Sequence, residues 1–260
     1  MPVLIGYLRS MSHLLSKWAL PALLTLWWSL GAAAATDTPS AMAERVRACT
    51  ACHGEQGRAA PDGYYPRLAG KPAGYLHHQL LNFAEGRRRY GPMAQLVQPL
   101  SDDYLLRMAS YFASLDVPYP APSREAPRIS TQALEHGRQL ALHGDAARKL
   151  PACATCHGTP LMGTQPNVPA LLGLPLDYLT AQLGAWQTGE RQAHAPDCMA
   201  EIVRRMNPND IIAVASWLSM QPVPTPSHAR NLPQGVALDA TLRCGSAPEL
   251  DAQPQQKGQP

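Results

Sequence analysis

Apolar residues in this chain recur at the spacing of one helix face, most clearly in two segments that follow strong helix-start signals. The first segment places four apolar residues at positions i, i+3, i+4 and i+7, namely Leu105, Met108, Ala109 and Phe112. Ser101 precedes this segment as an N-cap, and Asn207 followed by Pro208 precedes the second one in the same way. We therefore predict an amphipathic helix after Ser101 and another after Asn207.

Further helices are predicted over residues 41–49, 75–85, 129–143 and 178–188, whereas the alternation typical of strands is scarce. The predicted fold class is therefore all-α. A proline-rich stretch over residues 118–128 has the composition of a stiff, extended linker. Apolar periodicity fades after Pro222, so residues 223–260 are expected to form an irregular, extended tail.

The two helical parts are copies of each other. Matched residues run through both parts in the same order, namely Pro66 with Pro169, Tyr75 with Tyr178, Gln79 with Gln182, Arg88 with Arg191 and Met93 with Met199. We define the first repeat as residues 41–117 and the second repeat as residues 129–222. Each repeat is small enough to be marginally stable alone, so we expect a bound group to complete each apolar core.

Each repeat carries the pattern C-x-x-C-H, followed by glycine. Its residues are Cys49, Cys52 and His53 in the first repeat and Cys153, Cys156 and His157 in the second. This pattern attaches a c-type haem, because the two thiols add to the porphyrin vinyl groups and the histidine supplies one axial bond to iron. A helical turn that ends at the pattern brings both sulfurs to one porphyrin edge. Two covalently bound haems c, each with its iron, are therefore predicted.

Two other kinds of site use paired cysteines. A thioredoxin-like dithiol needs a βαβ context, and the chain shows little strand pattern near either motif. A zinc site would combine the four cysteines, which gives no reason for a histidine directly after each pair. Haem attachment is therefore the favoured interpretation.

Each haem iron needs a second axial ligand or an open position. Met93 and Met199 occupy matched loops just before the closing helix of each repeat, and a thioether is a soft ligand that raises the reduction potential of haem iron. We predict axial pairs of His53 with Met93 and of His157 with Met199. His194, which has no counterpart in the first repeat, is interpreted as an exposed loop residue.

Two matched prolines are expected to orient the haem histidines. Pro66 and Pro169 follow His53 and His157 at nearly the same distance along the chain. Backbone carbonyls commonly accept a hydrogen bond from the second nitrogen of a metal-ligating imidazole. We predict this role for both prolines.

The N-terminus has the pattern of an export signal. Arg9 and Lys17 flank an apolar stretch over residues 18–30, and the alanines at 32–35 offer a cleavage site before Thr36. Residues 1–35 are therefore predicted to be a signal peptide, and the mature chain periplasmic. An uncleaved anchor is the alternative, and only then would the chain associate with a membrane. The formal net charge of +3 gives no case for nucleic acid.

Cys198 and Cys244 are left over after haem attachment. An even remainder in an exported chain predicts a disulfide, with free thiols or an intermolecular bridge as the alternatives. The run Arg87-Arg88-Arg89 has three interpretations, which are a solvated loop, neutralisation of haem propionates, or partner docking.

The combination of C-x-x-C-H-G, P-x-L-x-G, Y-L-x-x-Q-L and a methionine loop before an apolar helix, all present twice, resembles the di-haem class I cytochromes c of the cytochrome c-four type. The resemblance covers about residues 41–221 and implies two tandem class I cytochrome c domains. It also implies haem propionate edges that lie close together. The longer tail, Cys198 and Cys244 depart from that family's pattern.

The resemblance implies an electron carrier without a substrate of its own. Its partners would be redox proteins, with a dehydrogenase or quinol-oxidising complex as donor and a terminal oxidase or reductase as acceptor. One alternative is a dedicated cytochrome subunit of a periplasmic dehydrogenase complex, with the tail as a docking element. A di-haem peroxidase is a further alternative, and it would need an iron that is open or able to lose a ligand.

Overall fold

The computed structural model describes residues 39–60, 63–120, 128–231 and 242–250. The structure separates into two compact units, and the boundary after Met42 falls within the first described helix. The packing described below is that of the unit that begins at Ala43. The predicted signal peptide and the centre of the predicted linker lie outside the described residues. No helix in the described part is long and apolar enough to cross a membrane.

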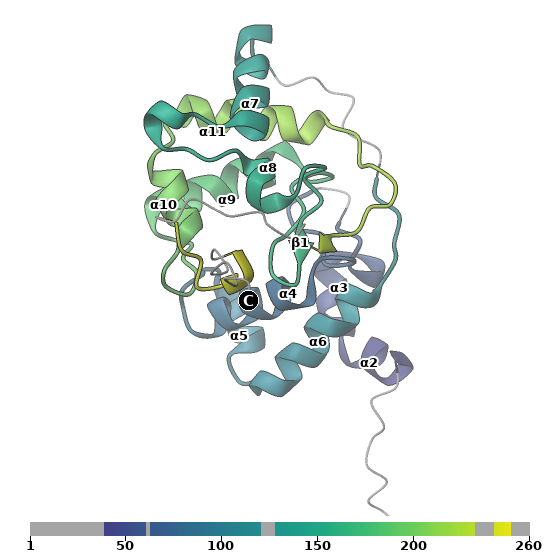
Figure 1. Ribbon diagram of the computed structural model, residues 1–260. Helices are drawn as coiled ribbons and strands as arrows, with labels where there is room; N and C mark the ends of the chain where they lie inside the picture. Colours follow the sequence, from purple (N-terminus) through teal and green to yellow (C-terminus); the bar gives the residue numbers. More distant parts are fainter. Residues whose placement is uncertain (1–38, 61–62, 121–127, 232–241, 251–260) are drawn as a thin grey trace, which may run out of the picture. The chain divides into compact units, whose positions relative to one another are not determined.

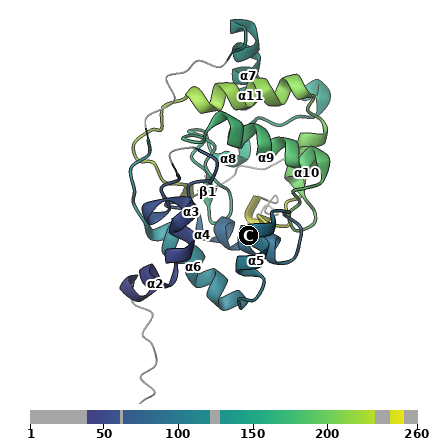
Figure 2. The same ribbon diagram turned by 180° about the vertical axis from the view of Figure 1, so that it is seen from behind.

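Helices form both repeats, as predicted (Figures 1 and 2). Those of the first repeat are α2 (Pro39–Arg45), α3 (Arg47–His53), α4 (Ala73–Ala84), α5 (Gly91–Val97) and α6 (Asp102–Ser114). Those of the second are α7 (Thr131–His143), α8 (Cys153–His157), α9 (Leu176–Thr188), α10 (Cys198–Arg204) and α11 (Pro208–Met220). Short 3₁₀ turns follow α3 and α7, at Glu55–Gly57 and Ala146–Arg148, and a third lies within the tail at Pro248–Leu250.

The predicted helix starts are confirmed. The Ser101 side chain accepts a hydrogen bond from the backbone N–H of Tyr104 at the start of α6. Asn207 and Asp210 form a reciprocal capping box at the start of α11. The predicted helix over 41–49 is instead divided at Val46, whose backbone (φ −96°, ψ 11°) leaves the helical region, and α3 continues to His53.

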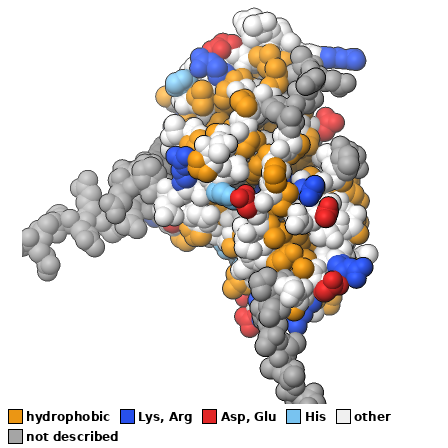
Figure 3. All heavy atoms as spheres, turned by 90° about the vertical axis from the view of Figure 1, so that its right-hand side faces the viewer, with side chains coloured by type: hydrophobic (Ala, Val, Ile, Leu, Met, Phe, Trp, Pro, Cys, Tyr) orange, Lys and Arg blue, Asp and Glu red, His pale blue; other side chains and the backbone are white. Residues whose placement is uncertain are grey.

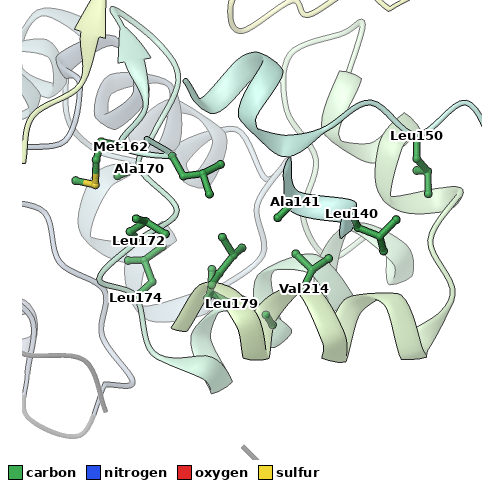
Figure 4. Packing of buried hydrophobic residues seen from close by; sticks show 12 residues of the cluster. Leu140, Ala141, Leu150, Met162, Ala170, Leu172, Leu174, Leu179 and Val214 are labelled. Carbon is green, nitrogen blue, oxygen red and sulfur yellow. The ribbon is translucent and has the colours of Figure 1, made fainter. Parts of the chain in front are cut away.

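The core of the second repeat forms where α7 crosses α11. Leu140 and Ala141 of α7 pack with Val214 of α11 and Leu179 of α9 (Figure 4). The crossing is tight, because a Cβ atom on Gly137 would lie 2.1 Å from the carbonyl oxygen of Ala213. Any side chain at position 137 would therefore push the two helices apart.

Residues 223–231 and 242–250, the described part of the tail, are irregular apart from two short elements, and some of them are buried rather than exposed. Arg230–Asn231 (β2) pairs in parallel with Thr164–Gln165 (β1). Residues Leu242–Leu250, which we call the C-terminal segment, place Leu242, Cys244, Ala247 and Leu250 in the interior. The predicted disulfide between Cys198 and Cys244 is confirmed and joins this segment to the start of α10.

The surface shows no field of one charge on the face drawn in Figure 3, where hydrophobic side chains lie between acidic and basic ones. This mixture agrees with the small net charge of +3. The inference that the chain has no nucleic-acid partner stays a prediction.

Candidate functional site: two cavities with matched linings

The first repeat encloses a cavity around the first C-x-x-C-H motif. Its lining includes all four residues predicted to hold the first haem, namely Cys49, Cys52, His53 and Met93. Helix α3 supplies the motif and α5 supplies the methionine. The structure therefore brings together side chains that lie far apart in the sequence.

The second repeat encloses a corresponding, smaller cavity. Its lining includes the other four predicted residues, namely Cys153, Cys156, His157 and Met199. Helix α8 supplies the motif and α10 supplies the methionine. The C-terminal segment also reaches this lining through Cys244, Ala247 and Leu250.

The two motif histidines are held in the same way. Nδ1 of His53 lies 2.7 Å from the carbonyl oxygen of Pro66, and Nδ1 of His157 lies 2.7 Å from that of Pro169. A carbonyl can only accept, so Nδ1–H donates in both cases and Nε2 carries the free lone pair. The contacts predicted for both prolines are confirmed, and the arrangement is that of an imidazole ready to bind a metal.

Both imidazoles are buried and kept neutral. Burial lowers the pKa of His157 to about 4, and the Pro169 carbonyl opposes this shift only in part. Burial likewise lowers the pKa of His53, against the effect of the Pro66 carbonyl. A neutral imidazole with a free Nε2 is the form that coordinates iron.

A glycine directly after each histidine turns the chain away from the helix. Gly54 has φ 76° and Gly158 has φ 78°, values that side chains rarely adopt. A Cβ on Gly54 would also lie 2.4 Å from the carbonyl oxygen of Ala59. These glycines let each motif end its helix at the cavity wall.

The motif thiols do not have the properties of a redox dithiol or a zinc site. They are not joined as disulfides, and burial raises the pKa of both Cys153 and Cys156 to about 11. Reactive and metal-bound cysteines have lowered pKa values instead. The two pairs line different cavities, and the described residues contain no cluster of histidine, cysteine and carboxylate side chains suited to a metal ion.

Three cations lie where the two repeats meet. Lys71 and Arg191 are buried and line both cavities, while Arg88 is half-buried and lines the first. The salt bridges of the described residues give none of the three a carboxylate partner. Burying unpaired charge is costly, so this arrangement fits anionic groups such as the propionates of two haems.

Two of these cations, Arg88 and Arg191, join the repeats through two shared glutamines. Oε1 of Gln79 accepts hydrogen bonds from Arg88 and Arg191, both at 3.0 Å. Oε1 of Gln182 accepts from Arg88 at 2.6 Å and from Arg191 at 2.9 Å. The solvated-loop interpretation is therefore wrong for Arg88, which bonds across the two repeats.

His194 lies at the second cavity rather than in a fully exposed loop. It is partly buried and belongs to the cavity lining. Its Nε2 is 2.9 Å from Nη2 of Arg87, so that nitrogen accepts a hydrogen bond and is not free to bind iron. Met199 lines the same cavity and stays the predicted ligand of the second iron.

Comparison with known proteins identifies the family. No family model matches the chain. A relative from Thiomonas intermedia (strain K12), named thiosulfate dehydrogenase electron acceptor, is 38% identical over 211 residues, which are 80% of this chain and 93% of the relative. Cytochrome c4 of Pseudomonas aeruginosa is 31% identical over 206 residues, 78% of this chain and 98% of that protein. The chain belongs to the cytochrome c4 family.

Solved structures agree with this assignment. Reduced cytochrome c4 from Pseudomonas stutzeri matches with a TM-score of 0.60 and 27% identity, over 70% of this chain and 97% of that one. Thiosulfate dehydrogenase (TsdBA) from Marichromatium purpuratum matches with a TM-score of 0.61 and 31% identity, over 71% of this chain and 40% of that longer chain. The prediction of two tandem class I cytochrome c domains is confirmed.

As a member of the cytochrome c4 family, the protein is an electron carrier rather than an enzyme, and it carries two covalently bound haems c. Each haem, when bound, takes up or releases one electron at its iron. The residues that line each cavity fit this group: two thiols that would attach it, an imidazole oriented by a carbonyl, an apolar lining that would exclude water, and cations that would face its acidic groups.

Proposed function

We propose that the cytochrome binds each haem through the eight residues predicted from the sequence. The axial pairs are His53 with Met93 and His157 with Met199, and the thioether bonds form at Cys49, Cys52, Cys153 and Cys156. The observation that carries this proposal is the matched lining of two separate cavities, each with a neutral histidine held by a proline carbonyl. The predicted domain boundaries, 41–117 and 129–222, belong to the same proposal.

Mass spectrometry of the purified holoprotein tests the attachment. We expect a mass that corresponds to two haems and that persists after acid-acetone extraction, which removes haem that is not covalently bound. Cys49→Ser with Cys52→Ser should leave one haem, held by the second repeat. Retention of two covalent haems by that variant would overturn the assignment of the first motif.

We further propose that the protein is exported and accepts electrons from a periplasmic dehydrogenase. Covalent haem attachment and the Cys198–Cys244 disulfide both suit a compartment outside the cytoplasm. The relative from Thiomonas intermedia is named as an electron acceptor of thiosulfate dehydrogenase, and the TsdBA structure shares the fold. These names favour a dedicated acceptor over a general respiratory carrier.

An anaerobic mixing experiment separates the two roles. The oxidised cytochrome is mixed with a purified thiosulfate dehydrogenase and thiosulfate, and reduction of its haems is followed by absorbance. A dedicated acceptor should be reduced far faster than horse-heart cytochrome c at the same concentration. Equal rates for the two cytochromes would contradict the dedicated role, while the two-haem mass would stand independently.

A further inference from the structure

The two attachment motifs differ in the exposure of their second cysteine. Cys52 of the first motif is exposed, whereas its counterpart Cys156 is 9% exposed. The thioether formed at this position marks one edge of the haem. If both repeats were equivalent, both edges would be equally accessible from solution.

The C-terminal segment buries the second of these sulfurs. Cys156 packs in an apolar cluster with Val168, Cys244, Ala247 and Leu250, with Cys198 against it. Three residues of this cluster therefore come from beyond the second repeat. No part of the described tail lines the first cavity, whose lining from outside the first repeat comes from α9 and the residues next to it.

Several contacts fix the C-terminal segment in place. The Cys198–Cys244 disulfide joins it to α10, and the backbone N–H of Gly245 donates to the carbonyl of Pro196 at 2.9 Å. Nδ2 of Asn167 donates to Oε2 of Glu249 at 2.9 Å. A Cβ on Gly245 would lie 2.3 Å from the carbonyl oxygen of Ala195, so the segment is in close contact with the loop before α10.

The lining of the first cavity includes exposed apolar side chains. Tyr64 is 62% exposed and Leu96 is 52% exposed, and both line the first cavity. Pro92 occupies the position that matches Cys198, so the first repeat lacks the cysteine that fastens the cover in the second. The first cavity is therefore more accessible than the second to a protein that approaches from solution.

We propose that the C-terminal segment is a cover that shields the edge of the second haem from solution, so that redox proteins exchange electrons with this cytochrome at the first haem. This proposal rests on the proposed haem attachment at the two motifs. A one-electron protein donor would lose its electron to the first iron, which is reduced from ferric to ferrous, and the second iron would then receive that electron from the first. Electron transfer slows steeply with distance between redox centres, so a covered edge is a poor entry point.

Paramagnetic NMR tests the cover directly. The fully reduced protein is diamagnetic, and a neutral gadolinium chelate broadens the signals of protons that it can approach from solution. The readout is the thioether methyl resonances of each haem. In the intact protein we expect the first-haem signals at Cys52 to broaden several-fold more than the second-haem signals at Cys156. Equal broadening would overturn the proposal.

Two truncated chains provide the matched comparison. A chain that ends at Thr241 and carries Cys198→Ser lacks the cover, whereas a chain that ends at Leu250 keeps it. In the chain that ends at Thr241, the chelate should broaden the signals of both haems alike. The chain that ends at Leu250 should behave like the intact protein. Continued protection of the second haem without residues 242–250 would also overturn the proposal.

Haem counting keeps this test separate from the test of the proposed function. A preparation with fewer than two covalent haems contradicts the haem attachment itself. A preparation with two haems and equal broadening contradicts the cover alone. If the chain that ends at Thr241 does not fold, the difference between the two haems in the intact protein still decides the question.

Discussion

The two haem cavities of this protein share their ligand arrangement and differ at their rims. Each has a motif histidine whose Nδ1 lies 2.7 Å from a proline carbonyl, and each has one methionine in a matched place on its wall. The second alone has a disulfide at the methionine and a buried sulfur at Cys156. The comparison teaches that the two repeats share the residues predicted to hold iron, while their surroundings differ in burial and in cross-links.

Removing the methionines should produce the largest effects. Met93→Ala and Met199→Ala should each lower the potential of one haem, on the order of 0.1 V or more, because the thioether stabilises ferrous iron. Each variant should also lose about half of the iron–thioether charge-transfer band in the oxidised protein, since two such bonds are expected. Spectro-electrochemical titration measures both quantities.

Met108→Leu and Met206→Leu are the matched controls for this prediction. Both methionines line the same two cavities but are not predicted ligands. They should leave the band and both potentials nearly unchanged. If one of these control variants loses the band, the ligand has been assigned to the wrong methionine.

Breaking the disulfide should affect the second cavity alone. The bridge joins residues 46 positions apart, so Cys244→Ser with Cys198→Ser should reduce the free energy of unfolding by about 3–4 kcal/mol on chain-entropy grounds. Denaturant unfolding followed at each haem's absorbance measures the loss. The first haem's ligand-release transition should stay where it is, and a shift there would show that the two cavities are not independent.

Replacing Asp210, a buried carboxylate of the second repeat, should have a smaller effect on stability than breaking the disulfide. It is buried, accepts hydrogen bonds from Arg148 at 2.6 Å and from His136 at 2.7 Å, and caps α11. Asp210→Asn should reduce the free energy of unfolding by about 2 kcal/mol, because the neutral amide removes the buried one of the two carboxylates that pair with Arg148. Thermal or denaturant unfolding at neutral pH measures this loss.

The pH dependence of that loss has a defined sign. Burial opposes ionisation of Asp210, but Arg148, His136 and Asn207 outweigh it and lower its pKa. A lowered folded-state pKa means that the stabilisation is present above the ordinary value of 3.8 and disappears as the pH falls through the folded-state value. The wild type and Asp210→Asn should therefore converge in stability under strongly acidic conditions.

Removing one of the arginines between the repeats should have the smallest effect on each haem. Arg191 lines both cavities and Arg88 lines only the first. Arg191→Gln should lower both haem potentials by tens of millivolts, because a lost positive charge favours the ferric state. Arg88→Gln should lower mainly the first. Equal shifts of both haems in Arg88→Gln would contradict this distinction.

Most of the candidate site could be predicted from the sequence because covalent chemistry imposes a fixed spacing. Cys49, Cys52 and His53 must be adjacent to act together, so their pattern survives in the linear chain. Met93 lacks such a local pattern and became identifiable only through its match with Met199. The helix starts at Ser101 and Asn207 were likewise local signals, and both are confirmed.

Contacts between distant segments were harder to predict. Gln79 and Gln182 matched in the repeat comparison, which signalled a shared role, but nothing in the sequence said that their partners lie in the other repeat. The tail showed no helical period, so it was expected to be irregular and extended, and only the leftover pair Cys198 and Cys244 predicted a link to the second repeat. The burial of residues 242–250 also depends on a few apolar side chains, which have no periodic signature in the sequence.

The shared glutamines also bear on how the two repeats came to be one molecule. Arg88, Gln79 and Tyr75 of the first repeat meet Arg191, Gln182 and Tyr178 of the second, and each arginine donates to the tyrosine of the other repeat. The contacts are reciprocal, as they are across the twofold rotation axis between identical subunits of a symmetric dimer. A single ancestral repeat with the same three residues could have paired with a second copy of itself, and fusion of the genes would then have made that partner permanent.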